Sequence, residues 1–128
     1  MINLALVGAG GAAGAMARYL TGQGVARLAG PSQAHLATLT VNILGGLLMG
    51  LLVGALALKL NEGGERWRLL LGVGALGGFT TFSAFSLDAV QMLERRQYVA
   101  MFAYVVASVV LSILALMLGF AVARRVFA

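Results

Sequence analysis

The chain contains 128 residues, of which 61% are apolar and only 10% are charged, and its formal net charge is +5. A soluble domain carries about a quarter charged residues, so this composition excludes an ordinary water-exposed surface and indicates an integral membrane protein. With no cysteine, one histidine and four acidic residues, disulfides and thiolate metal sites are excluded. No nucleophile–base pair or metal cluster can be assembled either, so we do not expect an enzyme.

The charged residues divide the chain into four apolar stretches. Residues 2–26 contain one charge, Arg18, whereas residues 36–58, 69–87 and 97–123 contain none. A transmembrane helix needs about 20 residues, and each stretch reaches that length or falls one residue short. We therefore expect an all-α fold, a single membrane domain over residues 1–128. Its four helices are predicted at about 2–27, 34–59, 67–94 and 97–125.

Four crossings would put both termini on one side of the membrane, and the basic residues are nearly balanced between the two sides. The terminal side would carry Lys59, Arg66, Arg68, Arg124 and Arg125, and the other side Arg27, Arg95 and Arg96, with Arg18 able to reach it. The positive-inside rule then gives only a slight preference for cytoplasmic termini. This balance permits either one weakly favoured orientation or an antiparallel dimer of identical chains.

Four helices of this size barely enclose a lumen, so a transport pathway would form between subunits and self-association is expected. The helix ends are expected to meet membrane lipid. Their basic residues occur in pairs rather than as a patch, so nucleic acid binding is not expected.

The third stretch contains a poor helix interior at residues 77–81, where Gly77 and Gly78 precede Thr80 and Thr81. This pattern predicts that the helix is broken near its middle. A break frees carbonyl groups that can coordinate a hard cation such as sodium, and N–H groups that favour anions. The alternative is that the glycines only allow close helix packing while the threonines bond back to their own helix.

Polar and aromatic residues recur along the other spans. They are Asn42 and Thr38 in the second span, Phe82 and Phe85 after the break, and Tyr104, Ser108 and Ser112 at four-residue spacing in the last. Hydroxyl and amide N–H groups donate to anions, and aromatic ring edges carry the positive part of the ring quadrupole. Weak neutral donors suit conduction, which requires release as well as binding. The alternative is that these groups form hydrogen bonds between helices.

Three blocks of sequence together resemble one known family. They are residues 10–19 (GGAAGAMARY), 38–45 (TLTVNILG) and 77–85 (GGFTTFSAF). The last is similar to a long signature, G-G-x-T-T-F-S-T-F, of the Fluc (CrcB) family of small bacterial fluoride channels. The chain departs from the family pattern at Ala37, Ala84, Asp88 and Leu116, positions that bear on conductance and the exit path.

The resemblance implies an antiparallel, dual-topology homodimer with two fluoride pores, which lets fluoride leave the cytoplasm passively across the bacterial inner membrane. It implies a structural sodium ion (Na+), not transported, held at the dimer centre by the backbone carbonyls of Gly77 and Thr80. It assigns to the pore the residues Asn42, Phe82, Phe85, Thr38, Tyr104, Ser108 and Ser112, and places Arg18 near the vestibule.

Two other functions fit a small membrane protein. A four-helix multidrug transporter couples its substrate to protons through a membrane-embedded carboxylate, expected in the first helix, and residues 2–26 contain no Asp or Glu. A non-conducting membrane subunit would need the polar residues only as contacts between helices, and would leave the predicted break unexplained.

Overall fold

The computed structural model describes residues 1–59 and 64–128, and all regular structure in these residues is helical. The first half contains α1 (Ile2–Ala29), a short 3-10 turn η1 (Pro31–Gln33) and α2 (Ala34–Lys59). The second half contains α3 (Gly64–Trp67), the π-helix η2 (Arg68–Leu76), α4 (Gly77–Phe79), α5 (Phe82–Glu94) and α6 (Tyr98–Phe127). No described residue lies in a β-strand, and the expected all-helical class is confirmed.

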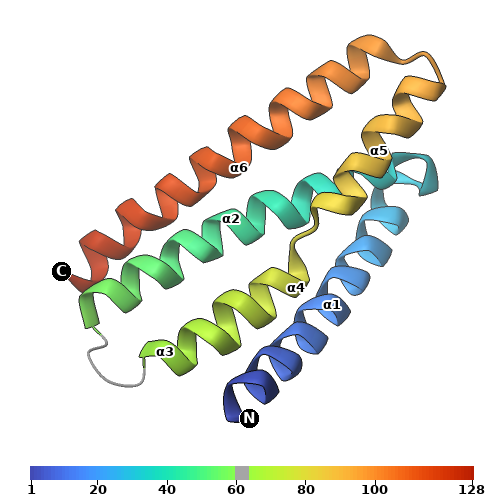
Figure 1. Ribbon diagram of the computed structural model, residues 1–128. Coiled ribbons are helices and arrows are strands. Elements are labelled where there is room, and N and C mark those ends of the chain that lie inside the picture. The colour runs from blue at the N-terminus through green and yellow to red at the C-terminus, as the bar shows by residue number, and fades with distance from the viewer. Residues whose placement is uncertain (60–63) are drawn as a thin grey trace.

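The helices form two closely packed groups within one bundle. Helix α2 packs along α6, and α1 packs along η2 and α4. Both termini lie at the end of the bundle where α2 finishes and α3 begins (Figure 1). At the opposite end, η1 leads into α2 and a short turn joins α5 to α6 (Figure 1).

Three helical segments of the described chain are long and apolar enough to cross a membrane: Pro31–Leu58, Gly64–Glu94 and Tyr98–Phe127. Helix α1 has 28 residues but is less apolar, because glycine and alanine dominate it and Arg18 interrupts it. By length and composition, the structure thus supports the second, third and fourth expected spans. The first expected span, which corresponds to α1, stays a prediction.

The surface of the bundle is apolar. Large side chains such as Val99 and Phe102 are 85% and 69% exposed, and exposed apolar residues of this kind recur along every long helix. Contiguous apolar surface is rare on soluble monomers and marks contact with membrane or protein. Lipid or another chain must therefore cover these faces.

Glycine allows the two helix groups to approach closely. A Cβ atom added at Gly14 would collide with the backbone carbonyl of Ala75, and one added at Gly50 would collide with that of Leu116. Small residues are used in this way between membrane helices. The glycines therefore set the spacing of α1 from η2 and of α2 from α6.

We expect Gly14→Ala to destabilise the protein by about 1–3 kcal/mol, because the added methyl group meets backbone rather than a flexible side chain. The matched control is Gly22→Ala in the same helix, where an added Cβ has no neighbour within 4 Å. The stability of both variants is measured by thermal unfolding in detergent, with size-exclusion chromatography used to monitor the folded fraction. Equal loss of stability in the two variants would show that the contact at Gly14 is not needed.

A tight turn at Arg95, Arg96 and Gln97 joins α5 to α6. Helix α5 ends in a Schellman motif, in which the Arg96 N–H bonds to the Leu93 carbonyl (3.0 Å) and the Gln97 N–H to that of Met92 (2.9 Å). Arg96 takes the left-handed conformation that this motif requires, with φ 58°. The turn reverses the chain and lays α6 against α2.

Candidate functional site

The helical rod that starts at α3 is interrupted between α4 and α5. Thr80 (φ −78°, ψ 159°) and Thr81 (φ −152°, ψ 121°) are both extended. Gly77 and Gly78 remain helical, so the predicted break falls at the carboxyl end of residues 77–81. The extended residues are the two threonines, not the glycines.

Each threonine satisfies its side chain locally. The Thr80 hydroxyl donates to the Leu76 carbonyl at 2.9 Å, as the packing alternative anticipated for this residue. The Thr81 hydroxyl oxygen accepts from the Ala84 N–H at 3.1 Å. Thr81 therefore caps the N-terminus of α5, which restarts the helix directly after the break.

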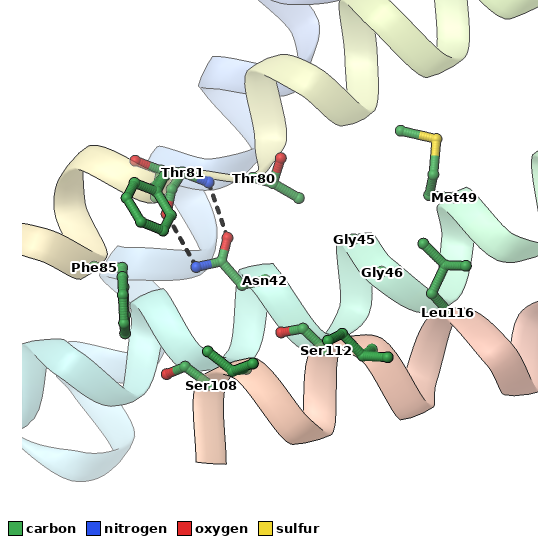
Figure 2. Close-up of a pocket in the computed structure, with 13 residues that line it drawn as sticks. Asn42, Gly45, Gly46, Met49, Thr80, Thr81, Phe85, Ser108, Ser112 and Leu116 are labelled. Carbon is green, nitrogen blue, oxygen red and sulfur yellow. Dashed lines mark hydrogen bonds between the residues drawn. The ribbon is translucent and has the colours of Figure 1, made fainter. Parts of the chain in front are cut away.

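Asn42, on α2, forms hydrogen bonds with the backbone of the break. Its side-chain N–H donates to the Thr81 carbonyl at 3.0 Å, and its side-chain oxygen accepts from the Thr81 N–H at 2.9 Å (Figure 2). The amide thus replaces both backbone partners that Thr81 would have in a continuous helix. The Asn42 amide has two N–H groups, and the bond to Thr81 uses one of them.

At the break, the N–H groups that would bond the Gly77 and Thr80 carbonyls in a continuous helix bond elsewhere. The N–H that would bond the Gly77 carbonyl in a continuous α-helix belongs to Thr81, and it donates to Asn42 instead. The N–H that would bond the Thr80 carbonyl belongs to Ala84, and it donates to the Thr81 hydroxyl. Both residues named for the cation thus carry released carbonyls at the break.

Metal binding through side chains has no support in the part of the chain that the structure describes. No three His, Cys, Asp or Glu side chains lie together there. The backbone oxygens at the break are of the ligand type that hard cations such as sodium accept in unwound membrane helices.

An open groove of about 410 Å³ lies beside the break, between α2, α5 and α6. Its lining is largely apolar but includes Asn42, Thr80, Thr81, Ser108 and Ser112 (Figure 2). Among the described residues, the hydroxyls of Ser108 and Ser112 are buried and have no hydrogen-bond partner. A buried hydroxyl without a partner is costly, so these two groups have unused hydrogen-bonding capacity beside the groove.

Aromatic rings run from this groove towards the end of the bundle where α5 turns into α6. Phe82 and Phe85 have ring centroids 5.4 Å apart, Phe85 and Tyr104 are also 5.4 Å apart, and Tyr104 meets His35 edge-on at 5.5 Å. The Tyr104 hydroxyl donates to Asp88 at 2.9 Å. The row joins residues of α2, α5 and α6.

The structure brings most of the predicted pore residues together. Asn42, Phe82, Phe85, Ser108 and Ser112 line the groove, while Thr38 and Tyr104 are buried and do not line it. Arg18 is half-buried on α1 and also lies outside the groove lining.

Sequence reasoning did not single out His35 or the capping role of Thr81. His35 could have been found from its spacing, since residues 35, 38 and 42 share one face of a helix. Thr81 immediately precedes α5, a position where threonine is favoured as a cap.

Residues 5–120 match the family described as "CrcB-like protein, Camphor Resistance (CrcB)". The chain belongs to this family. It is 60% identical over 128 residues to a protein of Phenylobacterium zucineum, and 53% identical over 128 residues to one of Caulobacter vibrioides, in both cases across 100% of each chain. A protein of Agrobacterium fabrum is 51% identical over 127 residues, covering 99% of this chain and 100% of its own. All three are named "Fluoride-specific ion channel FluC".

Membership in the CrcB family confirms the resemblance found in the sequence. It also confirms that the protein is not an enzyme, because this is a family of ion channels. Together with the three apolar helical segments, it identifies a multi-pass membrane protein. Neither the multidrug transporter nor the non-conducting subunit gains support from these relatives.

Proposed function

We propose that this protein is a fluoride-specific ion channel of the bacterial inner membrane, which lets fluoride leave the cytoplasm passively. The full-length similarity to relatives named as fluoride channels supports this function. The observation that carries it is the pair of buried, unpartnered hydroxyls of Ser108 and Ser112, two residues that line the groove. Fluoride is a small, strongly hydrogen-bonding anion, and such donors can replace part of its hydration shell.

The pathway is proposed to run along the groove and the aromatic row. Hydroxyl groups of α6 and the free N–H of Asn42 would face one side of the ion, and the ring edges of Phe82 and Phe85 would face it from α5. None of these groups carries a full positive charge, so the ion is bound weakly enough to leave. The Phe82 side chain is 78% exposed in a single chain, which suits a residue that faces a pathway completed by another chain.

A second copy of the chain is proposed to complete each pathway. The groove is open along one side, so one chain cannot enclose an ion. An antiparallel homodimer would bring two grooves together as two pores. Helix α1 is proposed as the fourth span, because it packs along η2 and α4, which belong to the apolar segment Gly64–Glu94.

A structural sodium ion is proposed at the centre of this dimer. The Gly77 and Thr80 carbonyls lack their helical partners for the reasons given above, and two chains would supply each carbonyl twice. The ion would be held by backbone oxygen and would not move with fluoride. Its contribution is to balance the carbonyl dipoles and hold the two breaks together.

Fluoride efflux from proteoliposomes, followed with a fluoride electrode, tests this function. We expect the double variant Ser108→Ala/Ser112→Ala to lose on the order of tenfold or more in initial rate, at about 1 kcal/mol for each lost hydrogen bond. Its stability should not fall, because no hydrogen bond within the described protein is removed.

The control is Ser86→Ala, since the Ser86 hydroxyl already bonds back to the Phe82 carbonyl at 3.0 Å. It should keep the wild-type rate. Wild-type efflux from the double variant would remove the two hydroxyls from the pathway.

A further inference from the structure

A second cavity, of about 550 Å³, lies at the end of the bundle where η1 leads into α2 and α5 turns into α6. Its lining is rich in polar side chains that can donate hydrogen bonds: Ser32, Gln33, His35, Gln91, Arg95 and Gln97. Asp88 is its acidic member. This composition contrasts with the mainly apolar groove and is typical of a compartment that holds water and ions.

Tyr104 separates this cavity from the groove. Its side chain is 5% exposed, and its ring lies between Phe85, which lines the groove, and His35, which lines the cavity. The Tyr104 hydroxyl donates to Asp88, another cavity residue, at 2.9 Å. An ion that moves along the aromatic row beyond Phe85 would therefore pass Tyr104 and enter the cavity next to His35 and Asp88.

The formal charges that line this cavity cancel, so its preference for an anion rests on its hydrogen-bond donors. Asp88 and Arg95, from α5 and the turn after it, have opposite charges, and the Asp88 carboxylate already accepts the Tyr104 hydroxyl. Helix α1 contributes Arg27 in its last turn, but this side chain is exposed and lies outside the cavity lining. The remaining polar groups can donate an N–H or O–H hydrogen bond, and the glutamine and serine side chains can also accept one. The His35 ring is the one in contact with Tyr104.

We propose that the second cavity is an anion-binding mouth of the pathway, in which His35 and Arg95 receive a small hydrated anion beside Tyr104. The anion is fluoride if the proposed channel function is correct, on which this inference rests. His35 then has two roles. Its ring packs against Tyr104, and its N–H donates to fluoride next to Tyr104.

Two substitutions at His35 separate these roles. His35→Phe keeps an aromatic ring against Tyr104 but removes the N–H donors, and His35→Glu places a negative charge in the mouth. We expect both to lower the initial rate of fluoride efflux from sodium-loaded proteoliposomes, His35→Glu by roughly threefold or more at low ionic strength, because charge in a cleft changes the local ion concentration.

The loss in His35→Glu should shrink when an impermeant salt is added, since the Debye length falls from about 30 Å at 0.01 M to about 3 Å at 1 M. The matched control is Gln23→Glu, an equally large charge change at an exposed position of α1 outside the cavity lining, which should keep the wild-type rate. Fluoride efflux at the wild-type rate in both His35 variants would contradict the proposal that this cavity is an anion-binding mouth. A loss of rate in His35→Glu that added salt does not reduce would contradict it as well. Failure of the channel function itself would be seen separately, as wild-type protein that gives no more efflux than empty liposomes.

Discussion

Exchanging sodium for a large organic cation such as N-methyl-D-glucamine on both sides of a proteoliposome membrane is expected to stop fluoride efflux. The carbonyls of Gly77 and Thr80 have lost their helical N–H partners to the Asn42 and Thr81 side chains. In the proposed dimer these partly negative oxygens face one another, and a small hard cation is needed to balance them. The organic cation is too large to fit between backbone carbonyls.

Two measurements make this result specific. Efflux should return when sodium is restored, which shows that the protein was not denatured. Empty liposomes carrying a fluoride ionophore should release fluoride equally in both cations, which excludes an effect on the electrode or the membrane. Unchanged efflux without sodium would contradict the central cation site while leaving the groove and its donors as proposed.

Asn42→Ala is the substitution with the largest expected effect on conduction. It removes both hydrogen bonds that fix the break and leaves the Thr81 N–H and carbonyl without those partners, at about 1–3 kcal/mol for each buried group. The pathway also loses the free N–H of the Asn42 amide. We expect fluoride efflux to fall close to the level of empty liposomes, with lower thermal stability in detergent.

A second variant separates the structural role of Asn42 from its role in the pathway. Asn42→Asp keeps an oxygen that can accept from the Thr81 N–H but adds a negative charge that repels fluoride. It should therefore abolish efflux while keeping the bond from the Thr81 N–H that Asn42→Ala removes, although an ionised carboxylate cannot donate to the Thr81 carbonyl as the amide does. The control is Thr40→Ala on the same helix, whose exposed hydroxyl bonds back to the Leu36 carbonyl at 2.7 Å. Wild-type efflux in both Asn42 variants would show that the residue serves packing alone.

The sequence predicted the helical class and an interruption of the third helix, because both follow from local composition. It placed the interruption within residues 77–81 but did not single out Thr80 and Thr81 as the extended residues. Gly78 stays helical, and α1 lies so close to it that a Cβ added there would collide with the Gly11 backbone. The extended residues are fixed by Asn42, which lies 39 positions from Thr81. A hydrogen bond between residues so far apart in the chain cannot be recognised from the local sequence around Thr81.

Other features depend in the same way on contacts between distant segments. The π-helix Arg68–Leu76 has no sequence pattern that distinguishes it from an ordinary helix. The contact of His35 with Tyr104 joins α2 to α6, so the partner of the histidine is set only once the helices are packed. By contrast, the four-residue spacing of Ser108 and Ser112 was enough to place them on one stripe of α6.

Fluoride and chloride efflux from the same proteoliposomes, prepared in sodium with the purified protein, tests the central claim most directly. A pathway of weak neutral donors sized for fluoride is expected to release fluoride rapidly and to hold chloride at the level of empty liposomes. Equal release of both anions, or no release of fluoride in sodium, would contradict a fluoride-specific channel.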